Sequence, residues 1–417
     1  MTPVREDELT QRSEFRLDYK SAYQVTSKSV IEFPWLCKAL AIGSTLDVEV
    51  MQKLCRAATK QSIGSFWQAN KLASGNGFSL KRKGKKIPPE WLKVLPVFDE
   101  EDGQLGFSKI LSQTFGKRYP SRLIESPRSE ELYSAPLLII PESLSGDIGD
   151  PAGYLIKNRK VCFSKSFFGY SAHGHRASTL VASLLATIVH SAVFRHFCYM
   201  RSSRVGASRR TIYKLDIDAF PFPEIETLTK DQRKEAMRLA NMLDASDEKN
   251  WKALDAFVGG LFGLTKAEQQ VVSDTVTFNG PYAVVREQAM RTVPTEEADA
   301  FVHTLEQAIQ PFFRAVGQKV KASLVPRLEG DWRQPWAFVT LLLDGDSWTP
   351  SEKLIASLIG KASDSAASRL VMPLPEGGLI IGLLNKRRFW TRSRARLCAL
   401  HIAEEYLERC FPLPARK

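Results

Sequence analysis

The spacing of hydrophobic positions changes along the chain, and each spacing predicts a kind of element. Apolar residues recur every three or four positions over Leu46–Lys60, which predicts an amphipathic helix. Short runs of large apolar residues at 135–140 and 161–164 predict two strands. A long, almost continuous apolar stretch lies within 177–199, and we expect it to form a buried helix. Together these patterns predict an α/β unit over residues 133–223.

The second half of the chain has a different pattern. Amphipathic stripes at 231–243, 251–262 and 296–318, with a capping-box sequence at Thr265–Glu268, predict a layer of helices. A β-rich run at 336–343 and a later hairpin pattern predict a small α+β unit at the end. The predicted fold class is therefore α/β, of the mixed α+β kind. The predicted segments are 1–70 (helical and extended), 71–230 (mixed α/β), 231–322 (helical) and 323–417 (small α+β).

Composition places the chain among ordinary globular proteins. Its 417 residues suggest two or three domains, and 44% hydrophobic with 25% charged residues is typical of a folded chain. Lys and Arg number 58 against 46 Asp and Glu, which gives a net charge of +12. This excess of positive charge favours a polyanionic partner such as nucleic acid.

Export and membrane signals are missing from the sequence pattern. The first 20 residues are charged and lack an apolar core, so we expect no signal peptide. The longest apolar stretch, at 180–193, is shorter than the roughly 20 residues of a membrane-spanning helix and contains His190. Six scattered cysteines without a CxxC pair favour free thiols over a zinc ribbon. We therefore expect a cytoplasmic protein with no membrane partner.

The densest positive run follows a glycine-rich turn. It contains Lys81, Arg82, Lys83, Lys85 and Lys86. Cations this close together repel one another, so they need either solvent or anions around them. The run therefore predicts either contacts with phosphates or a solvated loop.

A second basic cluster begins where the apolar helix is expected to end. Its candidate DNA contacts are Arg201, Ser203, Arg204, Arg209 and Arg210. Small residues between the arginines allow the backbone to approach a phosphodiester closely, and arginine has the fork geometry that reads guanine. The alternative is that these arginines interact with the last carbonyls of the helix. We favour DNA contact because the cluster continues past the helix end.

Aromatic and histidine residues between the strands and the helix have both a chemical and a structural interpretation. The aromatic residues are Phe163, Phe167, Phe168 and Tyr170. They would either stack on an unpaired or flipped base or pack in a core, and Tyr170 is the better stacking candidate because of its polar edge. His173 and His175 have the spacing of a metal-binding pair. They lack a third ligand nearby in sequence, so we expect a polar loop and no metal site.

The order of elements in the α/β unit carries a family resemblance. The features are the strands at 135–140 and 161–164, a leucine-rich helix at 180–191, a Pro-Phe-Pro exit at 221–223 and a helical tail at 254–265. This order resembles the TaqI-like C-terminal specificity domain of N6-adenine DNA methyltransferases and of type I and type IIG restriction–modification proteins. The resemblance covers roughly residues 65–275. It implies that residues 71–230 form a target-recognition domain that binds double-stranded DNA.

The catalytic signatures of that family are missing from the sequence. We find no FxGxG-type AdoMet loop and no Asn/Asp-Pro-Pro-Tyr/Phe tetrapeptide, and the Pro-Pro pair at 88–89 has the wrong neighbours. The sequence also lacks a phosphate-binding P-loop and a spaced PD…ExK nuclease pattern. We therefore expect no catalytic activity from the chain alone and no cofactor bound to it.

The combined pattern predicts a DNA-binding specificity subunit of a restriction–modification or related phage-defence complex. It would present target DNA to a separate adenine methyltransferase subunit that binds AdoMet. A nuclease or another defence subunit is a further partner that the sequence leaves open. Two alternatives also stay open: a diverged methyltransferase or nuclease with an unrecognised active site, and a structural subunit of a defence complex without DNA contact.

Overall fold

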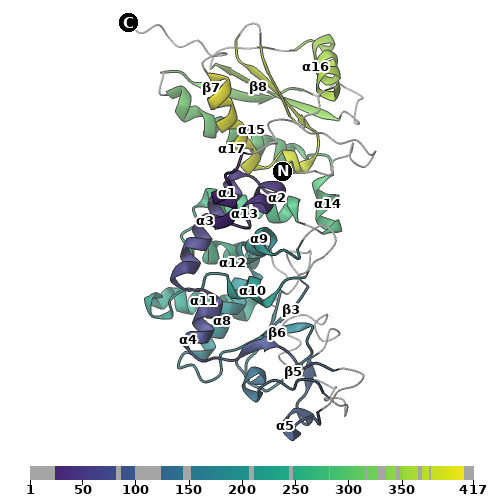
Figure 1. The fold of residues 1–417 in the computed structure, drawn as a ribbon. Coiled ribbons are helices and arrows are strands. Elements are labelled where there is room, and N and C mark those ends of the chain that lie inside the picture. Colours follow the sequence, from purple (N-terminus) through teal and green to yellow (C-terminus); the bar gives the residue numbers. More distant parts are fainter. Residues whose placement is uncertain are drawn as a thin grey trace. The chain divides into compact units, whose positions relative to one another are not determined.

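The computed structural model contains two compact units. The described residues are 24–80, 86–98, 124–143, 152–205, 211–243, 248–280, 282–314, 317–326, 335–343, 348, 350–364, 369–374 and 377–407. The central unit is Val48–Val276, and the terminal unit combines Met1–Asp47 with Thr277–Lys417. The described part is 54% helix and 18% strand, with three sheets, which confirms the predicted mixed α/β class (Figure 1).

The central unit is built on an antiparallel sheet. Its strands, in spatial order, are β1 (Ser74–Asn76), β6 (Phe167–Ser171), β3 (Leu137–Pro141) and β4 (Tyr154–Ile156). β6 is buried along its whole length and β3 along almost all of it, as expected of continuous apolar runs. A parallel pair joins β2 (Val97–Phe98) to β5 (Cys162–Phe163). The strands predicted at 135–140 and 161–164 are thus present as β3 and β5.

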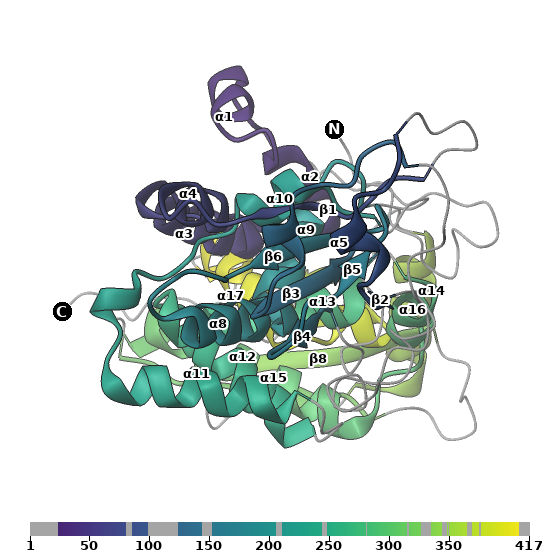
Figure 2. The same cartoon turned by 90° about the horizontal axis from the view of Figure 1, so that it is seen from below.

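Helices surround this sheet. Those that lie wholly or mostly in the central unit are α3 (Thr45–Lys60), α4 (Ile63–Ala69), α5 (Glu90–Lys93), α8 (Ser178–His190), α9 (Ala192–Arg201), α10 (Lys214–Asp218), α11 (Lys230–Met242), α12 (Glu248–Leu261) and α13 (Lys266–Asn279), with 3-10 turns η3 (Glu130–Tyr133) and η4 (Ile225–Thr227). α8 packs against β3 and β4 and also against α11 (Figure 2). The capping box predicted at Thr265–Glu268 is present: the Thr265 N–H donates to Glu268 and the Glu268 N–H donates to the Thr265 hydroxyl.

The apolar stretch predicted as one buried helix is buried but forms two helices. α8 and α9 meet at Ser191 with a bend of 66°. Ser191 has an extended backbone, and its hydroxyl accepts the Phe194 N–H at 3.1 Å. The carboxylate of Asp255, from α12, accepts the Ala192 N–H at 2.7 Å. Two caps, one local and one tertiary, therefore start a new helix at this point.

Among the described residues, no single helix has the length and apolarity to cross a membrane. α8 and α9 taken together pass a length and composition test as a bent pair. Their side chains are nearly all buried within the central unit.

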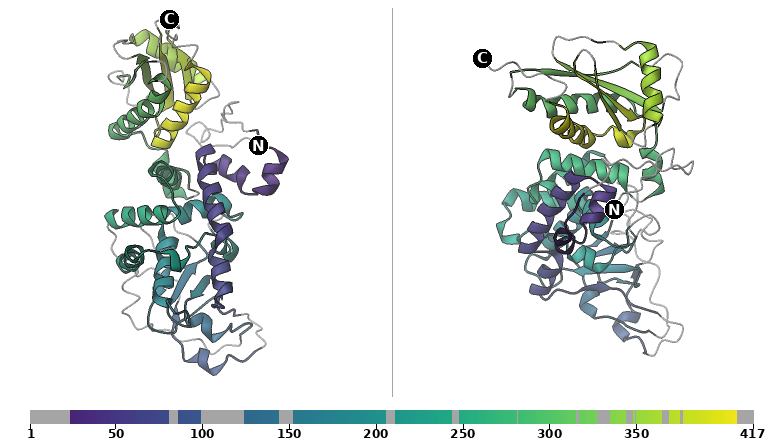
Figure 3. Two further views of the ribbon diagram at one scale, coloured as in Figure 1. Left: turned by 90° about the vertical axis from the view of Figure 1, so that its left-hand side faces the viewer. Right: turned by 45° about the horizontal axis from the view of Figure 1, so that its top comes forward.

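The terminal unit has its own antiparallel sheet. Its strands, in spatial order, are β7 (Val320–Leu324), β8 (Trp336–Leu343), β10 (Leu379–Leu384) and β9 (Arg369–Pro373). Its helices are α1 (Ser27–Glu32), α2 (Leu36–Ile42), α14 (Ala283–Ala289), α15 (Thr295–Arg314), α16 (Glu352–Asp364) and α17 (Arg392–Glu405), with the 3-10 turn η5 (Arg387–Phe389). α15 and α17 lie side by side along the sheet (Figure 3). Phe301, Trp336 and Trp390 are buried in their common core.

The two compact units divide the chain differently from the four predicted segments. Residues 231–276 belong to the central unit, where α11 and α12 pack on α8. The remainder of the predicted helical segment, 277–322, belongs to the terminal unit, where α15 packs on α17 and β7. Helical periodicity identified the helices correctly, but it contains no information about which partner each apolar face meets.

Candidate nucleic-acid interface

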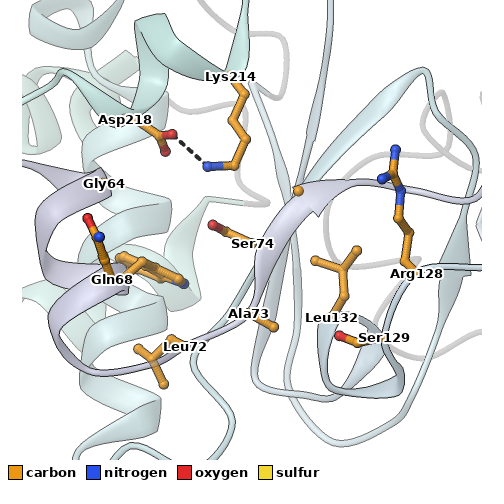
Figure 4. Close-up of a pocket in the computed structure, with 12 residues that line it drawn as sticks. Gly64, Gln68, Leu72, Ala73, Ser74, Arg128, Ser129, Leu132, Lys214 and Asp218 are labelled. Atoms are coloured by element: carbon orange, nitrogen blue, oxygen red, sulfur yellow. Dashed lines mark hydrogen bonds and ion pairs between the residues drawn. The ribbon is translucent and has the colours of Figure 1, made fainter.

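A pocket of about 510 Å³ lies in the central unit beside α4, β1 and α10 (Figure 4). Its lining residues are Gly64, Trp67, Gln68, Leu72, Ala73, Ser74, Gly75, Arg128, Ser129, Leu132, Lys214 and Asp218. Two of them are cations that come from distant parts of the sequence. Lys214 reaches down from α10, and Arg128 extends on the other side of β1.

One wall of the pocket is a hydrogen-bonded set centred on Asp218. Lys214 Nζ donates to Asp218 Oδ2 at 2.6 Å, and the Tyr170 hydroxyl donates to Asp218 Oδ1 at 2.7 Å. Burial raises the pKa of Tyr170 well above its usual value, and the charge of Asp218 adds to this effect. The phenol therefore stays protonated and acts as the donor. A Cβ on Gly64 would lie 2.8 Å from Asp218 Cβ, so glycine permits the close approach of α4 to α10.

The aromatic candidates for base stacking are core residues. Their exposed fractions are 0% for Phe163, 3% for Phe167, 4% for Phe168 and 0% for Tyr170. The ring of Trp67 packs edge-on against Tyr170, with centroids 5.4 Å apart. The prediction that Tyr170 contacts DNA is therefore corrected, because its ring faces are covered and its polar edge bonds Asp218.

The residues at both ends of the first basic run pair with one neighbouring segment, residues 124–126. Ser79 forms an antiparallel bridge with Ser126, and Lys86 forms one with Ile124. The Lys86 N–H donates to the Ile124 carbonyl at 3.1 Å, and the Ile124 N–H donates back at 2.9 Å. Lys86 is exposed, whereas Lys81, Arg82, Lys83 and Lys85 lie outside the described residues. Both ends of the predicted loop are thus fixed to residues 124–126.

That segment leads directly to the pocket. Arg128 follows Ser126 by two residues, so their Cα atoms are at most about 8 Å apart. Arg128 Nε donates to the Gly77 carbonyl at 3.3 Å, and Arg128 has a positive φ of 66°. Its side chain is exposed and lines the pocket, where it presents a guanidinium to solvent.

The second basic cluster starts at the C-terminal end of α9. Arg201 and Ser203 are exposed, and Arg204 is half-buried, whereas Arg209 and Arg210 lie outside the described residues. The Arg204 guanidinium lies over the ring of Tyr213, 4.1 Å from its centroid. The chain is fixed again where Thr211 bridges Ser143.

This cluster also leads to the pocket. Lys214 follows Tyr213 and is the first residue of α10, and its Cα lies at most about 11 Å from that of Thr211. Tyr213, just before α10, is 41% exposed and Leu215 is 76% exposed, so the start of α10 presents apolar surface next to Arg204. The described ends of both predicted basic loops therefore lie within a few residues of Arg128 or Lys214, which line one pocket.

Sequence reasoning missed Arg128, Lys214 and Tyr213. Each lies outside the dense positive runs. Their positions in or next to the pocket are visible only in the folded structure. The Tyr-Lys pair that precedes the Pro-Phe-Pro exit was the available signal, because it interrupts the loop with an aromatic residue beside a cation.

The histidine pair takes part in backbone contacts. His173 Nδ1 lies 3.2 Å from the Ala135 carbonyl oxygen, and His175 Nδ1 accepts the Ala177 N–H at 3.0 Å. Within the described ranges, no three His, Cys, Asp or Glu side chains gather as metal ligands. In comparisons with known proteins, the chain matches no protein-family model and no curated protein sequence.

Proposed function

We propose that this chain is the DNA-binding specificity subunit of a restriction–modification or related phage-defence complex. The observation that carries the proposal is the pocket lined by Arg128 and Lys214. Lys86, at the end of the first basic loop, pairs with Ile124, four residues before Arg128, and Thr211, just after the second loop, is three residues before Lys214. The net charge of +12 and the resemblance of residues 65–275 to a specificity domain support the same function.

Most of the contacts in the proposed interface are with phosphates, and a contact with a base is proposed for one residue. Lys86, Arg128 and Arg201 are exposed cations that suit backbone phosphates. The stacking of Arg204 on Tyr213 restricts the guanidinium while leaving its edge N–H groups able to reach a phosphate or a guanine. Lys214 contributes less net charge, because Asp218 neutralises it.

The catalytic step is assigned to a separate adenine methyltransferase subunit. That partner would bind AdoMet and take the target adenine out of the duplex. This chain would contribute the binding free energy and the position of the DNA relative to the partner. No cofactor is assigned to the chain itself.

Binding as a function of salt tests the DNA-binding half of the proposal. The dissociation constant for duplex DNA is measured for the full chain and for a variant with K86Q, R128Q, R201Q and R204Q. Each lost phosphate contact should flatten the slope of log K against log salt by about 0.9, so we expect the slope to fall by about 2 to 4. Lys230 and Lys234 are exposed on α11 and do not line the pocket, so K230Q/K234Q is the matched control. An unchanged slope in the four-residue variant, or a wild-type chain that does not bind DNA, would overturn the assignment.

Methylation tests the second half. A methyltransferase subunit that depends on this chain should methylate duplex DNA when the wild-type chain is added and much less with the four-residue variant. Equal methylation with both proteins would contradict a role in presentation. DNA cleavage or methylation by the purified chain alone, with a divalent metal or AdoMet, would favour the enzyme alternative instead.

A further inference from the structure

The terminal unit contains a polar groove between α15 and α17, with a volume of about 530 Å³. It is lined by His303, Thr304 and Gln307 of α15, by Arg392 and Arg396 of α17, and by two alanines, Ala300 and Ala308. The two helices lie side by side in Figure 3. A cavity of this size is comparable to those that hold nucleotide-sized ligands, roughly 300–1,000 Å³.

Helical spacing explains why these side chains share one groove. His303, Thr304 and Gln307 are three and four positions apart, so they project from the same face of α15. The other face of α15 carries Phe301, Leu305 and other apolar residues into the core below the sheet. Arg392 and Arg396 are likewise one turn apart on α17.

The charge of the lining is positive. Among the described residues that line the groove there is no carboxylate. Two acids of α15 make contacts elsewhere: Glu297 pairs with Arg387, and Glu306 accepts the Ala322 N–H at 3.0 Å. Glu296 and Asp299, one turn before Ala300 and His303, are exposed and do not line the groove. Arg392 is exposed and makes no hydrogen bond or ion pair with any described residue. Arg392 and Arg396 lie on successive turns of α17, a spacing at which both guanidinium groups can reach one anion.

We propose that this groove binds the phosphate group of a nucleotide unit, either free or within a nucleic-acid backbone. A guanidinium binds phosphate oxygens through two parallel N–H donors, and two arginines one turn apart can share one phosphate. The Thr304 hydroxyl, the Gln307 amide and a ring N–H of His303 supply further donors. The alanines leave room for the sugar and base. This inference does not rest on the proposed function, because the groove and the pocket near Arg128 belong to different units.

The test uses the full chain and three probes: deoxyadenosine, deoxyadenosine 5′-monophosphate and a short DNA duplex. Calorimetry should show that the wild-type chain binds at least one of the two phosphate-bearing probes. Deoxyadenosine, which has no phosphate, should bind at least tenfold more weakly than that probe or not at all. The R392Q/R396Q variant should lose at least tenfold affinity for whichever phosphate-bearing probe the wild type binds. The matched control K353Q/K361Q removes two exposed charges from α16 of the same unit and should bind like the wild type. Loss of duplex binding alone identifies a backbone phosphate, and loss of monophosphate binding identifies a free nucleotide.

The single variant R392Q separates loss of binding from misfolding, because the Arg392 side chain is exposed and makes no hydrogen bond with any described residue. We expect it to melt like the wild type and to lose several-fold affinity for the bound probe. Wild-type affinity in both arginine variants, or a wild-type chain that binds no phosphate-bearing probe, would overturn the inference. The groove would be rejected, and the proposed function left intact, if this test failed while the variant with K86Q, R128Q, R201Q and R204Q showed the expected flattening of the salt slope.

Discussion

The substitution Tyr170→Phe separates a structural role for Tyr170 from a role in stacking on a base. Phe keeps the ring and therefore any stacking, but it removes the hydroxyl that donates to Asp218 Oδ1 at 2.7 Å. Tyr170 is fully buried, so solvent cannot replace that donor. If the structural role is correct, Y170F lowers the stability of the central unit and leaves the chemistry of the ring unchanged.

The expected magnitude follows from the kind of hydrogen bond. A hydrogen bond to a charged acceptor contributes about 1.5–3 kcal/mol, and Asp218 keeps its second partner, Lys214, at 2.6 Å. We therefore expect Y170F to lower the free energy of unfolding by about 1–3 kcal/mol. The double-mutant cycle with Asp218→Asn should show a coupling energy of about 1 kcal/mol or more between the two residues.

Guanidinium denaturation followed by fluorescence and circular dichroism measures the effect on the transition that includes the central unit. Tyr213→Phe is the matched control, because it makes the same change at a side chain that is 41% exposed, where solvent can replace the partner of the hydroxyl. Y213F should change stability by less than about 0.5 kcal/mol. Wild-type stability in Y170F, with no coupling to D218N, would refute the structural role of Tyr170 as the donor to Asp218.

Three further substitutions test the fold around the site. Burial lowers the pKa of His190 from 6.5 to about 4, so the unfolded state binds more protons at this side chain, and the contribution of His190 to stability should fall by about 2–3 kcal/mol between pH 7 and pH 4.5. Burial raises the pKa of Asp255 to about 6, which acts in the opposite direction, so the quantity to measure is the difference in unfolding free energy between the wild type and H190Q at the two pH values; a difference that does not change with pH would contradict the prediction. Ser191→Ala removes the cap of α9 and should cost about 1 kcal/mol by the same assay, whereas no change would mean that Asp255 alone starts the helix. A Cβ at Gly77 would lie 1.9 Å from the Phe163 carbonyl oxygen, so G77A should lower the melting temperature and weaken DNA binding. G260A, on α12 away from the pocket and with nothing within 4 Å of the added Cβ, should do neither, and equal effects of the two would contradict the geometry.

Local patterns in the sequence predicted local structure well. The capping box at Thr265–Glu268 and the strands β3 and β5 depend on neighbouring residues or on a continuous apolar run, and they were identified correctly. The break between α8 and α9 was not predicted. One of its two caps, Asp255, lies 63 positions away from Ala192, and helical periodicity contains no trace of such a contact.

The candidate site shows the same limit. The two basic loops were predicted from charge density, but the position of their described ends near one pocket depends on bridges such as Lys86 with Ile124 and Thr211 with Ser143. Tyr170 was expected to be accessible because of its polar edge, yet its partner Asp218 lies 48 positions further along the chain. Side-chain polarity predicts that a buried group needs a partner, but it does not identify that partner.

Hydrogen–deuterium exchange with and without duplex DNA tests the central claim most directly, because it shows where DNA touches the chain. We expect DNA to slow exchange in peptides that cover 74–86, 124–132 and 201–214, which contain the pocket rim and the ends of both basic loops. Peptides of α11 and α12 should exchange at the same rate with and without DNA. Saturating DNA that leaves the three rim segments unprotected, or protects only other segments of the central unit, would contradict the account.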